Sequence, residues 1–315
     1  MQLAYKELNQ GITCIETYYR RPQLASCYMM EDTGEVAFID TGTAHTVPLI
    51  LELLEKKGLA PEAVKYVMPT HVHLDHAGGT GQMMAAFPNA TLIIHPHGAR
   101  HMISPEKIIA GATAVYGEET FKEDYGELLS VDEKRVIEAG ESHEVTLGNR
   151  KIVCLDTPGH ARHHLCFWDE KSRGFFTGDT FGIAYPEFTT SRGSFPFLPS
   201  TPVQFDPEAW HQTLDRLMSY DPQRMYLTHY CAIEVTEAFA AALHQQIDDY
   251  VAIAKQADPA NRYEEIHAGL TNYFQGRAKA HGCALSEAEV NDLLSLDLGL
   301  CAQGLEVWLQ RQEKN

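Results

Sequence analysis

Four side chains that commonly bind metal ions fall within six positions of this chain, directly after a short apolar segment. The segment Val64–Met68 predicts a β-strand, and the four side chains that follow it are His71, His73, Asp75 and His76. A divalent ion needs several lone-pair donors at roughly 2.0–2.2 Å, which imidazole and carboxylate groups supply. Without such a partner, four ionisable groups at the end of a buried strand would be costly to bury. We therefore predict that His71 and His73 face one ion and that Asp75 and His76 face a second.

This pattern resembles the metallo-β-lactamase-fold hydrolases, in particular their glyoxalase II-like branch. The resemblance implies three further ligands in a fixed order: a histidine in a Pro-Gly-His turn, an aspartate in a Gly-Asp dipeptide, and a late histidine after a strand. The chain has all three, as His160, Asp179 and His229, and each directly follows an apolar run. Sites of α/β proteins lie at such strand ends. The resemblance covers about residues 14–230.

The resemblance implies two divalent metal ions per chain, with zinc as the first expectation and iron or manganese as alternatives. The implied ligands of the first ion are His71, His73 and His160, those of the second are Asp75, His76 and His229, and Asp179 bridges both. Two ions about 3.5–4 Å apart lower the pKa of a shared water from 15.7 toward about 7. The resulting hydroxide would attack the carbonyl carbon of an ester or thioester, as in a thioesterase or lactonase. Asp75 is the predicted catalytic residue that orients this nucleophile and accepts its proton.

The resemblance also implies an α/β fold, the αββα metallo-β-lactamase sandwich, here with a C-terminal helical extension. We predict a catalytic domain over residues 1–230 and a helical region over residues 231–315. Helices are predicted over residues 234–256, 263–280 and 286–310, and Ser286 with Glu289 forms a capping box for the last one. Asp206 and Pro207 predict the start of another helix. The leucine-rich residues 293–298 fit either a homodimer contact or an ordinary helical core.

Two further segments are expected to support the ligands. Asp40 stands in Asp40-Thr41-Gly42, which resembles the Asp-x-Gly of the family, and its carboxylate is expected to accept a hydrogen bond from a ligand imidazole. A plain turn explains this tripeptide nearly as well. His163 and His164 follow His160 closely, and we interpret them as supporting or structural residues rather than as extra ligands.

The substrate pocket is predicted in the loop of residues 181–202, which is rich in aromatic residues, proline and glycine. Long loops in compact domains are usually functional, and pockets are mostly apolar with a few polar anchors. The predicted pocket residues are Tyr185, Phe188, Arg192 and Phe195. Tyr185 would hydrogen-bond a substrate oxygen, as a second catalytic residue, and Arg192 would bind a carboxylate. The alternative is that these loop residues only pack against the rest of the chain.

Charge and composition indicate which classes of binding partner this chain is expected to have. The chain has 25 basic and 43 acidic residues, a net charge of −18, which disfavours nucleic acid because duplex binding neutralises phosphates with lysine and arginine. It has no apolar run of the ~18–20 residues that span a bilayer, and its first ten residues lack a secretory pattern. Seven scattered cysteines, an odd number, do not indicate a disulfide framework. We therefore expect a cytoplasmic protein with a small-molecule substrate, no nucleic acid and no membrane.

Two other classes of function stay open at this stage. Some relatives use a single iron and dioxygen to oxidise sulfur, and their ligand motif can be the same as this one. Diiron reductases of the same fold typically carry glutamate where this chain has His73, together with a flavodoxin domain that this chain lacks. A non-catalytic relative that binds a small molecule is the third reading, and the complete ligand set argues against it.

Overall fold

The computed structural model describes residues 1–200 and 203–314, without the side chains of Val115 and Tyr116. The described chain forms two compact units. Unit 1 comprises Met1–Asp156, His163–Gly178 and Pro222–Ala232, and unit 2 comprises Thr157–Arg162, Asp179–Asp221 and the chain from Ile233 onward. Thr201 and Pro202, the last two residues of the predicted substrate loop, lie outside the described residues. The predicted domain boundary after residue 230 stays a prediction.

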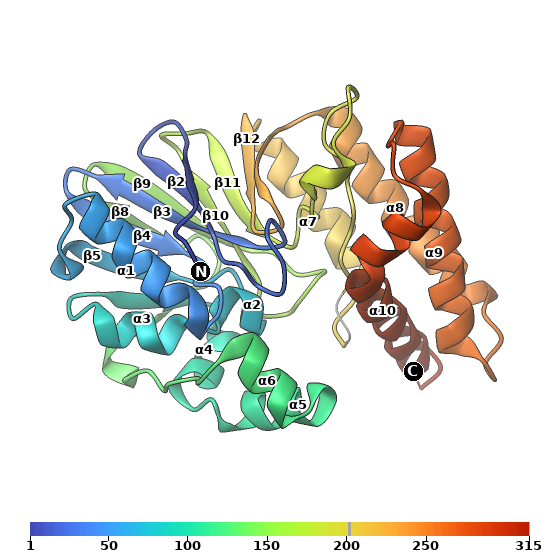
Figure 1. The fold of residues 1–315 in the computed structure, drawn as a ribbon, viewed down its shortest axis with the longest axis horizontal. Coiled ribbons are helices and arrows are strands. Elements are labelled where there is room, and N and C mark those ends of the chain that lie inside the picture. Colours follow the sequence, from blue (N-terminus) through green and yellow to red (C-terminus); the bar gives the residue numbers. More distant parts are fainter. Residues whose placement is uncertain (201–202, 315) are drawn as a thin grey trace. The chain divides into compact units, whose positions relative to one another are not determined.

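The first sheet has seven strands in sequence order (Figure 1). They are β1 (Tyr5–Glu7), β2 (Ile12–Glu16), β3 (Ser26–Asp32), β4 (Glu35–Ile39), β5 (Val64–Met68), β6 (Thr91–Ile94) and β7 (Val136–Glu138). Neighbours pair antiparallel from β1 to β4 and parallel from β4 to β7. Thr33 and Gly34 join β3 to β4 with φ angles of 51° and 82°. Positive φ at both residues is typical of tight two-residue hairpin turns, whose twist matches that of the flanking strands.

The second sheet has six strands in the order β13-β12-β11-β10-β9-β8. They are β8 (Glu144–Leu147), β9 (Arg150–Asp156), β10 (Leu165–Asp169), β11 (Gly174–Gly178), β12 (Arg224–Leu227) and β13 (Cys231–Glu234). This sheet is also mixed, since β11 pairs antiparallel with β10 and parallel with β12. One buried apolar cluster holds side chains of both sheets, including Tyr28 and Ile39 of the first and Phe176 and Tyr226 of the second.

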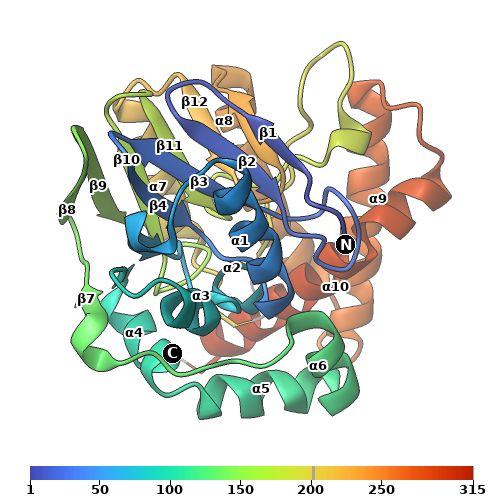
Figure 2. The same cartoon turned by 60° about the vertical axis from the view of Figure 1, so that its left-hand side comes forward.

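The other face of the first sheet is covered by helices of unit 1 (Figure 2). They are α1 (Val47–Lys56), α2 (Leu74–Ala77), α3 (Thr80–Ala86) and α4 (Pro96–Ile103). Two further helices, α5 (Glu106–Tyr116) and α6 (Glu118–Tyr125), follow α4 along the chain. A second buried cluster joins Ile50 and Leu53 of α1 and Met83 of α3 to Phe38 and Leu92 of the strands. Burying each such side chain contributes roughly 1.5–3 kcal/mol, so the layer of helices is held by this apolar contact.

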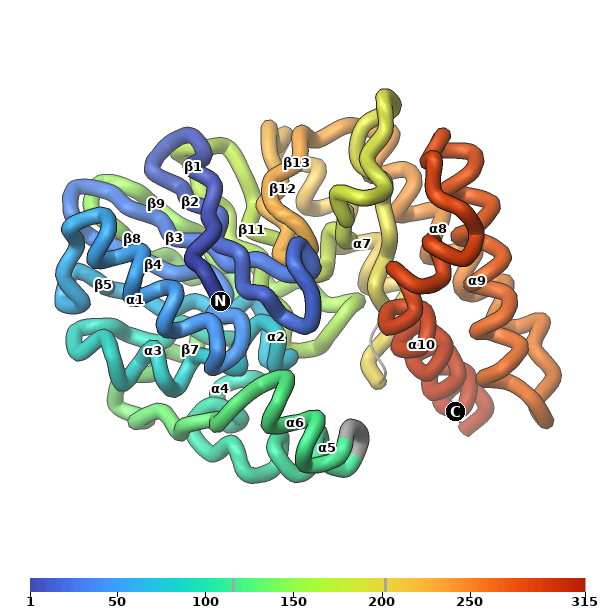
Figure 3. The backbone as a smooth tube through the Cα atoms, in the orientation of Figure 1, coloured from blue at the N-terminus to red at the C-terminus, as the bar shows by residue number. Residues whose placement is uncertain are grey.

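Unit 2 contains the α-helices of the C-terminal part of the chain (Figure 3). They are α7 (Pro207–Ser219), α8 (Glu237–Gln256), α9 (Arg262–His281) and α10 (Glu287–Gln312). The Asp206 side chain caps α7, and Ser286 with Glu289 forms the predicted capping box of α10. The predicted α/β class is confirmed: two mixed sheets are flanked by helices, and helices form the C-terminal part of the chain.

No helix among residues 1–200 and 203–314 combines the length and the hydropathy that crossing a bilayer requires. The predicted cytoplasmic location, small-molecule partner and homodimer contact stay predictions.

Candidate metal centre

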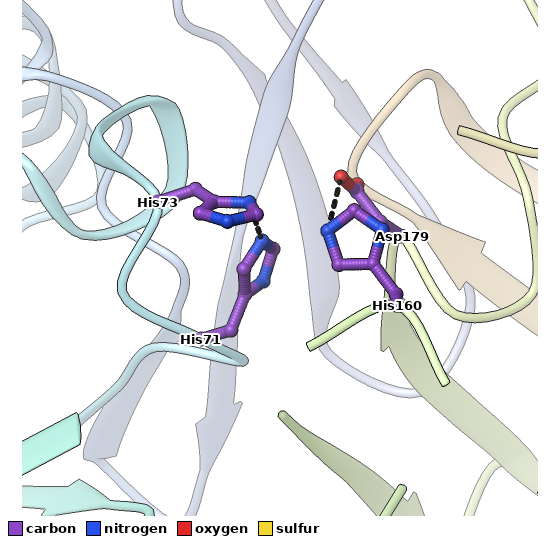
Figure 4. Close-up of side chains that lie close together, drawn as sticks. All are labelled: His71, His73, His160 and Asp179. Atoms are coloured by element: carbon purple, nitrogen blue, oxygen red, sulfur yellow. Dashed lines mark hydrogen bonds and ion pairs between the residues drawn. The ribbon is translucent and has the colours of Figure 1, made fainter. Parts of the chain in front are cut away.

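The turn after β5 carries the first predicted ligands. His71 is fully buried, and its Nε2 atom lies 2.8 Å from Nδ1 of His73 (Figure 4). The chain then turns into the short helix α2 (Leu74–Ala77), in which the His76 and Ala77 amides donate to the His73 carbonyl. This turn brings Asp75 and His76 onto the helix directly after the first pair, as the spacing predicts.

Asp75, His76 and His229 form a group in which one ligand atom of each residue lies within 4.8 Å of the others. His229 follows β12, so a residue far along the chain joins the turn after β5. Its Nε2 atom lies 3.2 Å from Oδ2 of Asp75 and 3.3 Å from Nε2 of His76. The structure thus brings together three residues predicted to hold the second ion.

The fully buried Asp40 is hydrogen-bonded to His76 and to the residues before His71 and His229. Its carboxylate accepts hydrogen bonds from the Thr70 amide at 2.7 Å, the Thr228 hydroxyl at 2.6 Å and Nδ1–H of His76 at 2.9 Å. Asp40 therefore connects the ends of β4, β5 and β12, and its carboxylate contacts the imidazole of His76, a predicted ligand.

The other two predicted ligands lie in unit 2. His160 Nε2 lies 3.3 Å from Oδ2 of Asp179 (Figure 4), and the ring packs edge-on against Trp210 at 5.7 Å. Gly159 precedes His160 with a φ of 132°, and a Cβ there would meet Trp210 Cβ at 2.5 Å, so only glycine fits this turn. His71, His73, His160 and Asp179 make up a second group whose ligand atoms all lie within 4.8 Å of one another.

The hydrogen bonds of the imidazoles identify which nitrogen faces the centre of each group. Nδ1 of His160 lies 2.7 Å from the Pro199 carbonyl, and Nδ1 of His229 lies 2.7 Å from the Leu24 carbonyl. Carbonyl and carboxylate oxygens only accept, so Nδ1 carries the proton in these rings and in His76. The Nε2 lone pairs consequently point at carboxylate oxygens, which is repulsive unless a cation lies among them. Imidazole and carboxylate donors in this orientation fit divalent metal ions.

His163 and His164 pack beside the ligands. The rings of His163 and His164 stack on His71, with centroids 6.1 and 4.9 Å away. Burial, together with the neighbouring His73, lowers the pKa of His163 to about 3, so this ring is neutral at physiological pH. Both rings therefore lie against His71, and their predicted supporting role stays a prediction.

No sequence pattern predicted the pairing of two tyrosines, one from the segment between β2 and β3 and one from α6. The hydroxyls of Tyr19 and Tyr125 lie 2.9 Å apart, and the rings stack at 5.7 Å. Burial is the main cause that raises the pKa of Tyr19, and the negative charge of Asp75 raises it further. The two residues are 106 positions apart and belong to no motif, so no local signal could have paired them.

The structure places the predicted pocket residues in unit 2 and gives each a contact there. The buried Tyr185 hydroxyl lies 3.2 Å from both carboxylate oxygens of Asp297, and the Arg192 guanidinium donates to the Ala280 carbonyl at 2.7 Å. The rings of Phe188 and Phe195 stack with centroids 5.3 Å apart. Their role in substrate binding, and the catalytic role of Tyr185, stay predictions.

The two mixed sheets and the His/Asp groups that follow their strands are those of a metal-binding protein of the metallo-β-lactamase class. The chain belongs to the metallo-beta-lactamase superfamily, whose family model matches residues 20–229. It is similar to the metallo-beta-lactamase fold-containing protein ST1585 of Sulfurisphaera tokodaii, with 25% identity over 66% of this chain and 73% of the relative. The crystal structure of ST1585 superposes with a TM-score of 0.65 at 20% identity, covering 95% of this chain and 99% of that one.

Two curated relatives carry names that specify a reaction. The hydroxyacylglutathione hydrolase of Maricaulis maris is 26% identical over 79% of this chain and 72% of its own length. The human acyl-coenzyme A thioesterase MBLAC2 is 24% identical over 56% of this chain and 65% of its own length. The first of these relatives supports the resemblance to the glyoxalase II-like branch.

Proposed function

We propose that the chain is a metal-dependent hydrolase of a small-molecule ester or thioester. The observation that carries this proposal is the pair of ligand groups, each of which combines imidazoles with a carboxylate. The proposed ligands are His71, His73 and His160 for one ion, Asp75, His76 and His229 for a second, and Asp179 for both. Divalent ions held there supply Lewis acidity and lower the pKa of water, and zinc is the ion we propose first.

Within this proposal the chain's own residues orient the reactants and move a proton. The Asp75 carboxylate, 3.2 Å from the His229 ring, accepts the proton that the attacking water loses. Asp40 keeps Nδ1 of His76 protonated and the ring fixed, so that its Nε2 lone pair stays aimed at the group. The paired hydroxyls of Tyr19 and Tyr125 offer hydrogen-bond donors for a polar group of the substrate.

The names of two relatives support a thioester as the substrate class, since both describe hydrolysis of a thioester. The acid-rich chain, with a net charge of −18, makes a phosphodiester in nucleic acid a poor substrate by comparison. We therefore propose an acyl thioester of a small thiol, with esters and lactones as the next classes to assay.

The test is a panel of thioesters, esters, lactones and phosphodiesters, assayed with protein reconstituted with zinc, manganese or iron. We expect thioester or ester hydrolysis that Asp179→Ala reduces by more than the roughly 10–100-fold typical of residues that only orient a ligand. Asp32→Ala, which replaces a buried aspartate at the end of β3, is the matched control and should retain activity in its folded fraction.

Three outcomes would overturn the proposal. Full activity of Asp179→Ala would refute its proposed role as a ligand of both ions. One iron per chain with dioxygen consumption would make the protein a sulfur-oxidising dioxygenase instead. No hydrolysis across the panel by metal-loaded protein would favour a non-catalytic ligand-binding relative.

A further inference from the structure

A second histidine pair lies within unit 2, on two neighbouring helices. His211 of α7 and His244 of α8 face each other with their Nδ1 atoms 2.7 Å apart. The rings are nearly parallel, with an interplanar angle of 8° and centroids 5.0 Å apart. The pair contains none of the residues predicted as ligands of the metal centre.

Each ring of this pair is oriented by a carboxylate from the opposite helix. His211 Nε2 lies 3.2 Å from Oδ1 of Asp248 on α8, and His244 Nε2 lies 3.3 Å from Oδ1 of Asp215 on α7. Because a carboxylate accepts and does not donate, both Nε2 atoms carry protons. The two Nδ1 atoms therefore present lone pairs to each other, and only a cation between them, either a proton or a metal ion, relieves the repulsion.

The spacing of this pair resembles that of the expected metal ligands. His71 and His73 have their facing nitrogens 2.8 Å apart, against 2.7 Å for His211 and His244. The arrangement of carboxylate, imidazole and open lone pair is also the one that metal-binding histidines use, because the acceptor fixes the tautomer and the ring. Two such pairs of carboxylate and imidazole face each other here, from the neighbouring helices α7 and α8.

An ion can reach the pair from solvent. The side chains of His211 and His244 are 31% and 27% exposed, and those of Asp248 and Asp215 are 69% and 78% exposed. The two carboxylates also favour a cation by charge, in a chain that is acidic overall. The exposed side leaves coordination positions that water can fill.

We propose that His211 and His244 form an additional binding site for a divalent transition-metal ion of the zinc, copper and nickel class. The ion binds the two Nδ1 lone pairs and relieves their repulsion, while Asp215 and Asp248 keep the rings in place. Imidazole suits this class of ions, whereas calcium and magnesium require oxygen ligands and are excluded. The site joins α7 to α8, so its occupancy also stabilises that helix pair.

The experiment uses full-length protein whose metal centre is already loaded with zinc. Equilibrium dialysis against increasing zinc, followed by metal analysis, should show one further zinc per chain in the wild type. His211→Asn and His244→Asn should lose this further zinc, and Asp248→Asn should weaken its binding roughly 10–100-fold. The matched control is His267→Asn. His267 is a partly exposed histidine of α9 whose ring lies beside Tyr263, so this variant should retain the further zinc.

A second readout separates binding from misfolding. Added zinc should raise the unfolding temperature of wild type and His267→Asn, but not that of His211→Asn, while all three keep the same circular dichroism and hydrolytic activity. The proposal is overturned if His211→Asn and His244→Asn bind as much zinc as the wild type, or if calcium binds equally well. A further zinc that is lost equally in His267→Asn would also overturn it, because the binding would then be nonspecific.

Discussion

At the scale of single residues, Asp40 is the acceptor on which the second ligand group depends. It is fully buried and receives donors from Thr70, His76 and Thr228. Asp40→Asn would turn an NH₂ group toward one of these donors, which leaves buried groups unsatisfied at a cost of about 1–3 kcal/mol. We expect about 10–100-fold weaker metal binding, measured as metal content after dialysis against a graded chelator.

Asp32 offers the matched control for Asp40, and it also predicts a pH dependence. Its carboxylate accepts from the Lys171 ammonium group and from the Asn149 amide, and these contacts lower its pKa below the ordinary 3.8. A native pKa lowered in this way stabilises the fold above pH 3.8, and the stabilisation is lost as the pH falls through the native pKa. Asp32→Asn should retain its metal, unlike Asp40→Asn.

The measurement is the free energy of unfolding in urea between pH 7 and pH 2.5. The wild type should exceed Asp32→Asn at neutral pH, and the difference should shrink only on the acid side of pH 3.8. A difference that stayed constant over the whole range would show that the charge of Asp32 contributes nothing to stability.

At the scale of elements, α7 positions the turn that carries His160. Trp210 of α7 lies against Gly159, and its indole N–H donates to the Thr180 carbonyl at 2.7 Å. One side chain therefore contacts both the residue before His160 and the residue after Asp179. Gly159→Ala adds a Cβ that would lie 2.5 Å from Trp210 Cβ. We expect the turn to shift, with loss of metal and of activity, measured by metal analysis and by the thioester assay.

Gly193→Ala is the control for that substitution. Gly193 also has a positive φ, 97°, but a Cβ there would meet no atom within 4 Å. It therefore carries the backbone strain, of order 1–3 kcal/mol, without the clash. Equal metal loss in both variants would show that backbone strain alone, and not contact with Trp210, controls the position of His160.

The elements that sequence patterns predicted are those with local signals. The ligands follow apolar strands, Asp206 caps α7 through its own side chain, and Ser286 with Glu289 closes the capping box of α10. These signals depend on residues a few positions apart, which a pattern can detect.

Contacts between distant elements had no such signal. The pairing of Tyr19 with Tyr125, and of His211 with His244 across 33 positions, depends on how helices and loops pack. The loop residues Tyr185 and Arg192 show the same limit, because their contacts with Asp297 and Ala280 come from helices α10 and α9. Packing of this kind follows from the whole set of side chains in the core, not from a short pattern.

At the scale of the whole molecule, the metal centre should couple ion binding to stability. An ion that binds only the folded chain stabilises it by RT ln(1 + [L]/Kd), about 2.7 kcal/mol at a hundredfold excess over Kd. The ligands also gather imidazole lone pairs and the carboxylates of Asp75 and Asp179, which repel one another when no cation is bound. Chelation should therefore lower the unfolding temperature by on the order of 5 °C, and restoring zinc should reverse the change.

Calorimetry of the same sample before chelation, after chelation and after reloading measures this coupling, with metal content determined at each stage. Asp179→Ala should show a much smaller response to chelation, because it starts with less metal. His211→Asn should respond like the wild type when zinc is supplied only at the level that fills the metal centre, since its ligands lie elsewhere. If metal-depleted wild type unfolds at the same temperature as the loaded protein, the ligand groups do not depend on ions for their stability, and the assignment of these residues as a metal centre fails.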